Sequence, residues 1–334
     1  MKSLADEIIG GRRLNRKDDL TVLLYADLEE LRQGADEIRR ALCGDRADLC
    51  SIINGRSGRC SENCRFCAQS AHYETDCNVY GFLDRQELLD NCGQMYLRGV
   101  DRFSVVTSGR TMEGDDLERS VEAYAAMHER YPDMVLCASH GLMSVEDMKR
   151  LKEAGVTMYH TNVETSSRYF PEICTTHTYE DKLAQIRRVK EAGLSVCSGG
   201  IFGMGESWQD RLDMAVMLAE LEVGSIPLNF LIPVKGTPLE DQPALTREEI
   251  VRIAALFRYI NPEAHIRIAA GRIYFEDGAE ILFRSGANAV LTGDMLTTAG
   301  SGTAQDREML TRLGFTLKED KSGAGQNQEG TVCI

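Results

Sequence analysis

The sequence predicts an α/β protein whose core is a (βα)₈ barrel of the TIM type, preceded by a helical N-terminal extension. Short runs rich in β-branched residues alternate with amphipathic stretches of helical periodicity along most of the 334 residues. Eight such runs are found, and one helical stretch links each intervening pair, which favours parallel pairing with right-handed crossovers. A closed barrel satisfies this pattern best, and an open doubly wound sheet is the alternative.

The individual elements follow from periodicity and from their end signals. The expected strands span residues 49–53, 103–107, 134–138, 158–163, 194–198, 227–232, 266–270 and 289–292. The expected helices span residues 85–98, 117–130, 145–153, 179–192, 207–221, 247–259 and 276–284. Gly155, Gly193 and Gly286 each follow a last helical turn, where a left-handed C-cap is needed. Thr246 and Glu249 are spaced as a capping box.

Three segments divide the chain. Residues 1–47 are expected to form the helical extension, and residues 48–319 the barrel. Residues 320–334 are polar and rich in glycine, which is typical of a mobile C-terminal tail.

Composition limits the classes of function. The net charge of −14 argues against a general surface for nucleic acid or anionic membranes, because both attract Lys and Arg. Hydrophobic residues make up 43%, enough for a large core, yet no apolar run is long enough to span a membrane. The first fifteen residues mix charges throughout and do not resemble a signal peptide. A cytoplasmic enzyme is expected.

Cysteine is abundant for such a protein. The chain has eleven cysteines, which calls for an explanation. Without secretion, a disulfide framework is not expected. Metal binding or redox chemistry is therefore the favoured explanation for some of them. Others, such as Cys92 and Cys174, fit the role of small buried hydrophobic residues.

One cysteine cluster follows the first expected strand. Cys60, Cys64 and Cys67 have the spacing C-x₃-C-x₂-C, which suits three irons of a cubane cluster and leaves the fourth iron open. An open iron can coordinate a substrate or a cofactor. Zinc is the alternative, and it would need a fourth ligand nearby, for which Cys77 or His72 would serve.

The motif CSENCRFC, with Phe66 before its third cysteine, matches the signature of the radical S-adenosylmethionine (SAM) superfamily. The wider stretch INGRSGRCSENCRFCAQSAHY resembles the biotin synthase family. The resemblance runs from about residue 41 to residue 315. It continues through HTNVETS, ICTTHTY, VCSGGIFGMGES, PLNFLIPVKGTP, IRIAAGR and NAVLTGDMLTT.

This resemblance implies that the methionine part of SAM chelates the open iron of a 4Fe-4S cluster. One electron then cleaves a C–S bond of SAM and yields a 5′-deoxyadenosyl radical. Two successive hydrogen abstractions would activate dethiobiotin, and an auxiliary iron–sulfur cluster would give up the sulfur that completes biotin. The chain would thus be a sulfurtransferase whose cofactors carry the difficult chemistry.

A second set of residues has the right strand parity to meet inside the barrel. Cys137, Cys197 and Arg267 lie on the third, fifth and seventh expected strands, and alternate strands fill the same inner layers. The two cysteines could be core residues, but a guanidinium in so apolar a strand needs an anionic partner. The resemblance implies an auxiliary 2Fe-2S cluster, or a variant of higher nuclearity, at Ser104, Cys137, Cys197 and Arg267.

Ser104 departs from this family pattern, which has cysteine there. A neutral hydroxyl is a poor ligand for iron compared with a thiolate. Cys50, on the first expected strand, is a candidate replacement, because many biotin synthases carry serine at that position, close to the auxiliary cluster. The alternative is that Cys50 only packs against its neighbours.

The resemblance also assigns binding residues. Phe66, Glu164, Lys182, Gly200, Gly203 and Gly205 are the positions expected to contact SAM. Glu164 would bind the ribose, although the family usually has Asp, and Lys182 would bind the methionine carboxylate in place of an arginine. Asn162 and Asn229 would contact the ureido ring of dethiobiotin.

Partners are likewise expected from the family: a flavodoxin or ferredoxin as electron donor, iron–sulfur assembly proteins and a second identical subunit. Two alternatives remain. One is a related radical SAM enzyme without sulfur insertion, such as a hydrogenase maturase or a methylornithine-forming mutase. The other is a noncatalytic protein that binds zinc or a cluster. His160 and His177 fall within family-like motifs, and the other four histidines are expected to be ordinary.

Overall fold

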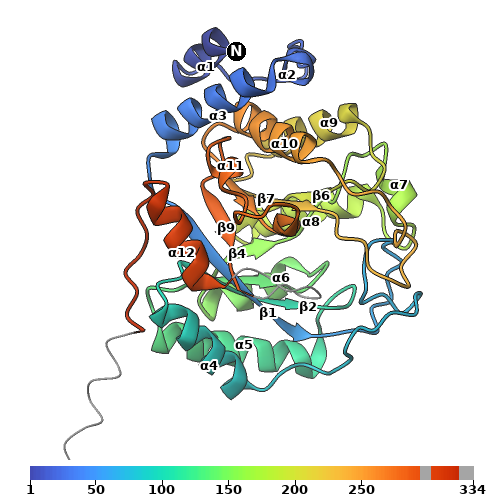
Figure 1. The fold of residues 1–334 in the computed structure, drawn as a ribbon. Helices are drawn as coiled ribbons and strands as arrows, with labels where there is room; N and C mark the ends of the chain where they lie inside the picture. The colour runs from blue at the N-terminus through green and yellow to red at the C-terminus, as the bar shows by residue number, and fades with distance from the viewer. Residues whose placement is uncertain (294–301, 323–334) are drawn as a thin grey trace, which may run out of the picture.

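The computed structural model describes residues 1–293 and 302–322 and shows a closed parallel barrel (Figure 1). Neighbouring strands pair in the order β5-β4-β3-β2-β1-β9-β8-β7-β6, and a further β5–β7 pairing closes the sheet. The strands are β1 (Asp48–Arg56), β2 (Arg102–Thr107), β3 (Val135–Ser139), β4 (Val156–His160), β5 (Ser195–Cys197), β6 (Gly200–Phe202), β7 (Ser225–Phe230), β8 (His265–Ile268) and β9 (Ala289–Leu291). The predicted barrel is confirmed, and the open sheet is ruled out.

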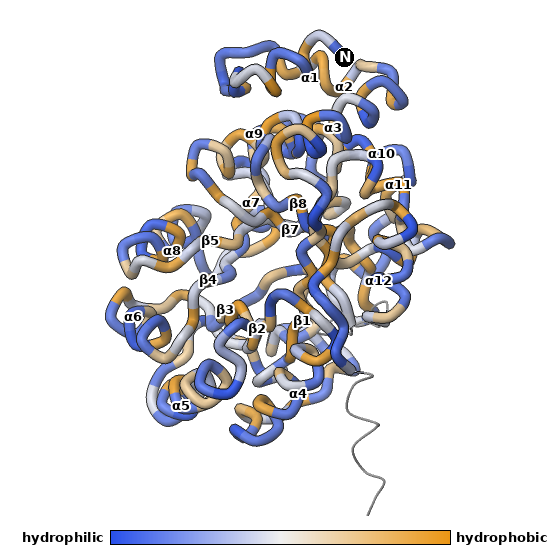
Figure 2. Tube along the Cα trace, turned by 90° about the vertical axis from the view of Figure 1, so that its left-hand side faces the viewer, coloured by the Kyte–Doolittle hydropathy of each residue, from blue (hydrophilic) through white to orange (hydrophobic). Residues whose placement is uncertain are grey.

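Helices lie on the outside of this barrel. Figure 2 shows β1 to β5, β7 and β8 surrounded by helices that include α4, α5, α6 and α8. The helices are α1 (Lys2–Ile9), α2 (Val22–Tyr25), α3 (Leu28–Cys43), α4 (Arg85–Leu97), α5 (Gly114–Arg130), α6 (Val145–Glu153), α7 (Phe170–Ile173), α8 (Tyr179–Glu191), α9 (Trp208–Glu220), α10 (Arg247–Ile260), α11 (Glu280–Phe283) and α12 (Thr303–Arg312). A 3₁₀ turn, η1 (Arg272–Tyr274), follows β8.

The end signals behave as expected. Gly155, Gly193 and Gly286 have φ values of 101°, 73° and 99°, so each occupies the left-handed region in which a side chain would be strained. The Glu249 amide donates a hydrogen bond to the Thr246 hydroxyl, and the Thr246 amide donates one to the Glu249 carboxylate. These local signals define where the outer helices start and stop.

Three elements differ from the prediction. No strand was expected between residues 198 and 227, but residues 200–202 form β6, which pairs with β7 as β5 does. β4 spans Val156–His160 rather than residues 158–163, and Glu164, just beyond the expected end, has a φ of 68°. The helix expected at 276–284 keeps only the four residues of α11, because Gly278 and Ala279 both have positive φ.

The N-terminal helices lie outside the ring of barrel helices. Figures 1 and 2 show α1, α2 and α3 on the side of α10, and α3 packs directly on α10. A Cβ at Gly34 would come within 1.9 Å of the Tyr259 hydroxyl, so the two helices approach closely only because residue 34 has no side chain. The boundaries at residues 47 and 319 stay predictions. The expected tail lies largely in 323–334, and part of the motif at 288–298 lies in 294–301, both outside the described residues.

Candidate active site

The loop after β1 carries the three motif cysteines to the carboxyl end of the barrel. Backbone bonds hold it in place: the Cys60 amide donates to the Gln69 carbonyl at 3.0 Å, and the Cys67 amide to the Cys64 carbonyl at 3.0 Å. Cys60, Cys64 and Cys67 all line one cavity of about 360 Å³ that runs into the barrel. The carboxyl end of the strands is where barrel enzymes place their active sites.

The ligands proposed to complete a zinc site at this motif are engaged elsewhere. The Cys77 sulfur lies 3.5 Å from the Ser57 hydroxyl, and the His72 ring contacts the Ser61 carbonyl at 3.0 Å. Within residues 1–293 and 302–322, neither shares a compact group of metal ligands with the motif cysteines. The zinc alternative that used them therefore lacks its fourth ligand.

Cys174 is buried among hydrophobic residues, as expected, and it also lies next to the motif. Its sulfur is 3.8 Å from that of Cys64 and 3.3 Å from Nδ1 of His177. This closeness could not be predicted from local patterns, because 110 residues separate the two cysteines. Cys92 behaves as expected and is fully buried in the main core.

The second set of cysteines lines the deep end of the same cavity. Cys50, Cys137 and Cys197 all face it, as does Ser104. These four residues come from four strands, β1, β2, β3 and β5, and the register places Ser104 directly beside Cys137. Burial is the main reason that the pKa of Cys50 rises to about 11 and that the pKa of Cys137 rises well above its usual value.

Two buried arginines stand beside these thiols and share one carboxylate. Arg102 donates to Asp48 at 2.8 Å, and Arg267 pairs with the same Oδ1 atom. Burial alone would raise the pKa of Asp48, but Arg267 and Arg102 lower it to about 2. With one carboxylate against two guanidiniums, the deep end keeps an uncompensated positive charge. An anionic partner would balance that charge.

Asp48 and His160 are site residues that sequence reasoning missed. Asp48 starts β1, where a charged residue is usually solvated, and only the closed barrel shows that it is buried. His160 was noted only as part of a motif. Its Nδ1 lies 3.4 Å from the sulfur of Cys197, and the Ser225 hydroxyl lies 3.5 Å from the same sulfur. The charges on His160 and Arg267 lower the pKa of Cys197 against the effect of burial.

Two asparagines and one glutamate lie between the two sets of cysteines. Asn162, Glu164 and Asn229 line the cavity. The amide oxygen of Asn162 accepts the Gly199 N–H at 3.0 Å, and that of Asn229 accepts the Ala270 N–H at 3.3 Å. Each side chain therefore keeps an N–H free to donate to a ligand. Oε2 of Glu164 is buried without a hydrogen-bond partner, which is costly unless a ligand hydroxyl meets it.

Most of the remaining predicted positions lie around the cavity rather than in its lining. Lys182 lies on α8, and its charge opposes the net rise in the pKa of His177. A Cβ at Gly200 would meet the Glu164 carbonyl at 2.1 Å, and Gly203 and Gly205 have φ values of 93° and 108°. The backbone alone thus explains these three glycines. Phe66 does line the cavity.

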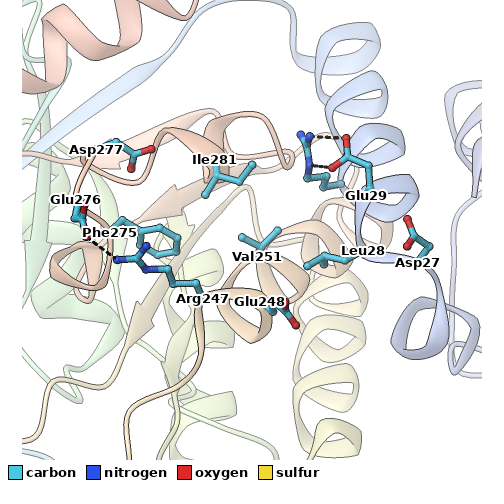
Figure 3. Close-up of a pocket in the computed structure, with 11 residues that line it drawn as sticks. Asp27, Leu28, Glu29, Arg247, Glu248, Val251, Phe275, Glu276, Asp277 and Ile281 are labelled. Atoms are coloured by element: carbon cyan, nitrogen blue, oxygen red, sulfur yellow. Dashed lines mark hydrogen bonds and ion pairs between the residues drawn. The ribbon is translucent and has the colours of Figure 1, made fainter.

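Two other pockets are present among the described residues. One of about 220 Å³ adjoins the central cavity and shares Phe66, Cys67 and Asn229 with it. The other, of about 650 Å³, is an open surface pocket between α3, α10 and the segment before α11 (Figure 3). Its arginines are already paired, Arg32 with Glu29 and Arg247 with Glu276, so it has no cation left for a ligand.

Comparisons with known proteins agree with this arrangement. Residues 56–218 match the Radical SAM superfamily, and residues 227–316 match the Biotin and Thiamin Synthesis associated domain. The biotin synthase of Clostridium beijerinckii is 56% identical over 317 residues, which cover 95% of this chain and 100% of the relative. That of Alkaliphilus metalliredigens is 56% identical over 95% of this chain and 99% of the relative.

Solved structures share the fold at low identity. A methylornithine synthase superposes with a TM-score of 0.81 at 20% identity, covering 96% of this chain and 99% of that one. The FeFe-hydrogenase maturase of Carboxydothermus hydrogenoformans gives 0.76 at 17% identity, covering 94% and 79%. These two likenesses show the barrel alone. The full-length identity to the curated relatives and the two matched domains show that this chain belongs to the biotin synthase family of radical SAM enzymes.

Proposed function

We propose that this chain converts dethiobiotin to biotin, with the sulfur supplied by an auxiliary iron–sulfur cluster in the barrel. The observation that carries the proposal is a single cavity with the motif cysteines at its mouth and Cys50, Cys137 and Cys197 at its deep end. Two asparagine amides lie between them. A radical SAM enzyme without sulfur insertion has no need of a second thiol set with a buried guanidinium.

The residues at the mouth fit a site-differentiated 4Fe-4S cluster and SAM. Cys60, Cys64 and Cys67 supply three thiolates from one loop, which leaves one iron for the cofactor. The unpartnered Oε2 of Glu164 is an acceptor for the ribose hydroxyls. When bound, the cluster and SAM supply a 5′-deoxyadenosyl radical, and the surrounding protein orients the substrate and excludes water. Lys182 adds positive charge near the methionine carboxylate.

The asparagines are suited to a cyclic urea. Asn162 and Asn229 each have their amide oxygen fixed by a backbone N–H, so each side chain is held in one orientation. The free N–H groups can donate to the ureido carbonyl of dethiobiotin. This pair would hold the ring in the cavity that both sets of cysteines line.

The deep thiols fit an auxiliary cluster in which Cys50 takes the place of Ser104. Cys50, Cys137 and Cys197 line the cavity together, and the charge of Arg267 acts to lower the pKa of each thiol. Iron prefers thiolates to a serine hydroxyl. Arg267 is bound to Asp48 and to the Val290 carbonyl at 2.9 Å, so it would stabilise an anionic cluster through its charge.

The expected partners extend this proposal. A flavodoxin or ferredoxin would supply the electrons, iron–sulfur assembly proteins would rebuild the clusters, and a second identical subunit and a cytoplasmic location follow from the family. No helix among residues 1–293 and 302–322 is both long and apolar enough to cross a bilayer.

The test is anaerobic incubation of the reconstituted chain with SAM, a low-potential reductant and dethiobiotin. Biotin and 5′-deoxyadenosine should both form. Ala at Cys60, Cys64 or Cys67 should abolish 5′-deoxyadenosine, whereas Ala at Cys137 or Cys197 should abolish biotin alone. SAM cleavage without biotin in the wild type, at full occupancy of both clusters, would reject the proposal in favour of a related radical enzyme.

A further inference from the structure

Beside the motif lies a second group of metal ligands, formed by Cys64 together with two residues that sulfur insertion does not use. Cys64, Cys174 and His177 each offer one ligand atom, and these atoms all lie within 4.8 Å of one another. Cys174 and His177 are buried, and Cys64 is half-buried. Neither Cys60 nor Cys67 belongs to this group, although both share the motif loop with Cys64.

The spacing suits one tetrahedral ion. Two thiolates bound at about 2.3 Å to a tetrahedral Zn²⁺ lie about 3.8 Å apart, and the Cys64 and Cys174 sulfurs are 3.8 Å apart. The two ring nitrogens of His177 lie 3.3 Å (Nδ1) and 3.9 Å (Nε2) from the Cys174 sulfur, both near the separation expected of neighbouring ligands on one ion. A cubane, in contrast, binds each cysteine to a different iron.

The histidine is oriented as metal-binding histidines are. Nδ1 of His177 lies 2.5 Å from Oε2 of Glu62, so that carboxylate fixes the proton on Nδ1. Nε2 is then the ring nitrogen left to bind a metal. A carboxylate behind the far nitrogen of a histidine ligand is the usual outer partner at zinc sites. Thr176 also donates to Glu62, at 2.8 Å, which holds the carboxylate in place.

The two loops that carry the ligands are tied together. The Arg65 amide donates to the Ile173 carbonyl at 2.9 Å, and the Asn63 side chain bonds the Thr175 hydroxyl at 2.7 Å and the Thr175 amide at 2.9 Å. The edge of the Phe170 ring packs on the His177 ring at a centroid distance of 5.6 Å. The group is therefore formed before any ion arrives.

We propose that Cys64, Cys174 and His177 bind a single divalent thiophilic cation, such as Zn²⁺, when the motif lacks its cluster. Water would take the fourth position. Because Cys64 would serve either the ion or the cubane, the two would exclude each other. The ion site itself does not depend on the proposed conversion of dethiobiotin, and its test needs neither SAM nor substrate.

The test uses the cluster-free full chain, prepared anaerobically and titrated with Zn²⁺ and with Co²⁺ as a coloured probe. Wild-type protein should bind one ion with the thiolate-to-cobalt absorption of a site with two sulfur ligands. Cys174→Ser should weaken Zn²⁺ binding by about a hundredfold or more, since it removes a ligand. Glu62→Gln should weaken it by about ten- to a hundredfold, the usual effect of losing an outer partner.

Cys60→Ser and Cys67→Ser are the matched controls, because each removes a thiol of the same loop that lies outside the group. Both should bind Zn²⁺ like the wild type. Losses in these two equal to that in Cys174→Ser would place the ion on the motif itself and overturn the proposal, as would a wild type that binds no ion. Circular dichroism of each variant verifies its fold. Bound Zn²⁺ should also slow assembly of the 4Fe-4S cluster in the wild type and leave it unaffected in Cys174→Ser.

Discussion

At the scale of single residues, the site contains side chains that already form hydrogen bonds with the backbone. Asn162 shows this well, because its oxygen accepts the Gly199 amide and its side-chain N–H group is left free at the cavity. The sequence could predict that Asn162 and Glu164 lie at the end of a strand. It could not predict which atom is free, since that depends on the turn imposed by the positive φ of Glu164.

Substitution of Asn162 should separate ligand binding from this structural bond. Asn162→Asp keeps an acceptor for the Gly199 amide but loses the N–H donor, whereas Asn162→Ala loses both. Both variants should weaken dethiobiotin binding by about 1–3 kcal/mol if the donor bonds the ureido carbonyl. Equilibrium binding to the reconstituted enzyme with SAM measures this. Wild-type affinity in both variants would contradict the assigned role, and an unchanged spectrum of the first cluster is the control.

The ligands of the auxiliary cluster give a second prediction at this scale. Cys50→Ala should lose the cluster, because it removes the thiolate that stands in for the missing cysteine, whereas Ser104→Ala should keep it. Mössbauer spectra and an iron count after reconstitution measure the difference. Loss in Ser104→Ala with retention in Cys50→Ala would make the serine the ligand and reject the relocation.

Residues distant in sequence were the ones that patterns could not reveal. Cys174 was expected only to be a small buried residue, and nothing in the local sequence links it to Cys64. Asp48 was hidden for a similar reason, since only closure of the barrel brings Arg102 and Arg267 against it.

At the scale of elements, the helix caps could be predicted from the sequence. The division of the fifth strand of the barrel into β5 and β6 could not. The boundaries of α6 and α8 follow closely from periodicity and from their C-cap glycines. β6 escaped prediction because it is only three residues long and begins next to two glycines. These positions require glycine, because a Cβ at Gly199 would lie 1.9 Å from the Pro227 carbonyl and one at Gly200 would lie 2.1 Å from the Glu164 carbonyl.

The start of α9 gives a prediction at this scale. The buried Asp210 carboxylate accepts from Ser166 at 2.6 Å and from the Ser207 amide at 2.8 Å, and it also pairs with Arg168. Asp210→Asn should lower the free energy of unfolding at pH 7 by about 2 kcal/mol, because hydrogen bonds to a buried charge are lost. Urea denaturation measures this, and Asp213→Asn, on the exposed face of α9, should change little.

The pH dependence of the same variant has a defined sign. Burial opposes ionisation of Asp210, but the bonds from Arg168, Ser166 and Ser207 outweigh it and lower the pKa of the carboxyl well below its usual range. The stabilisation is therefore complete above the unfolded pKa of about 4 and fades as the pH falls below it. The difference between wild type and Asp210→Asn should shrink from pH 4 downward, and a constant difference would contradict this cause.

At the scale of the whole molecule, the closed barrel is what makes the chemistry feasible. It places the motif cysteines, the asparagines and the deep thiols along one cavity, although they come from strands spread over more than two hundred residues. The alternation of strands and helices was enough to predict this closure. The motifs predicted the family. The structure adds that Arg102 and Arg267 share the single carboxylate of Asp48 beside the deep thiols.

The most direct test of the central claim is to follow the sulfur atom. The chain is reconstituted with heavy-isotope sulfide, freed of unbound sulfide, and given dethiobiotin, SAM and reductant for one turnover. Mass spectrometry of the product should show biotin carrying the heavy isotope, with the auxiliary cluster lost in step. Biotin without the label, or labelled biotin formed while the auxiliary cluster stays intact, would contradict the proposal that this cluster is the sulfur donor.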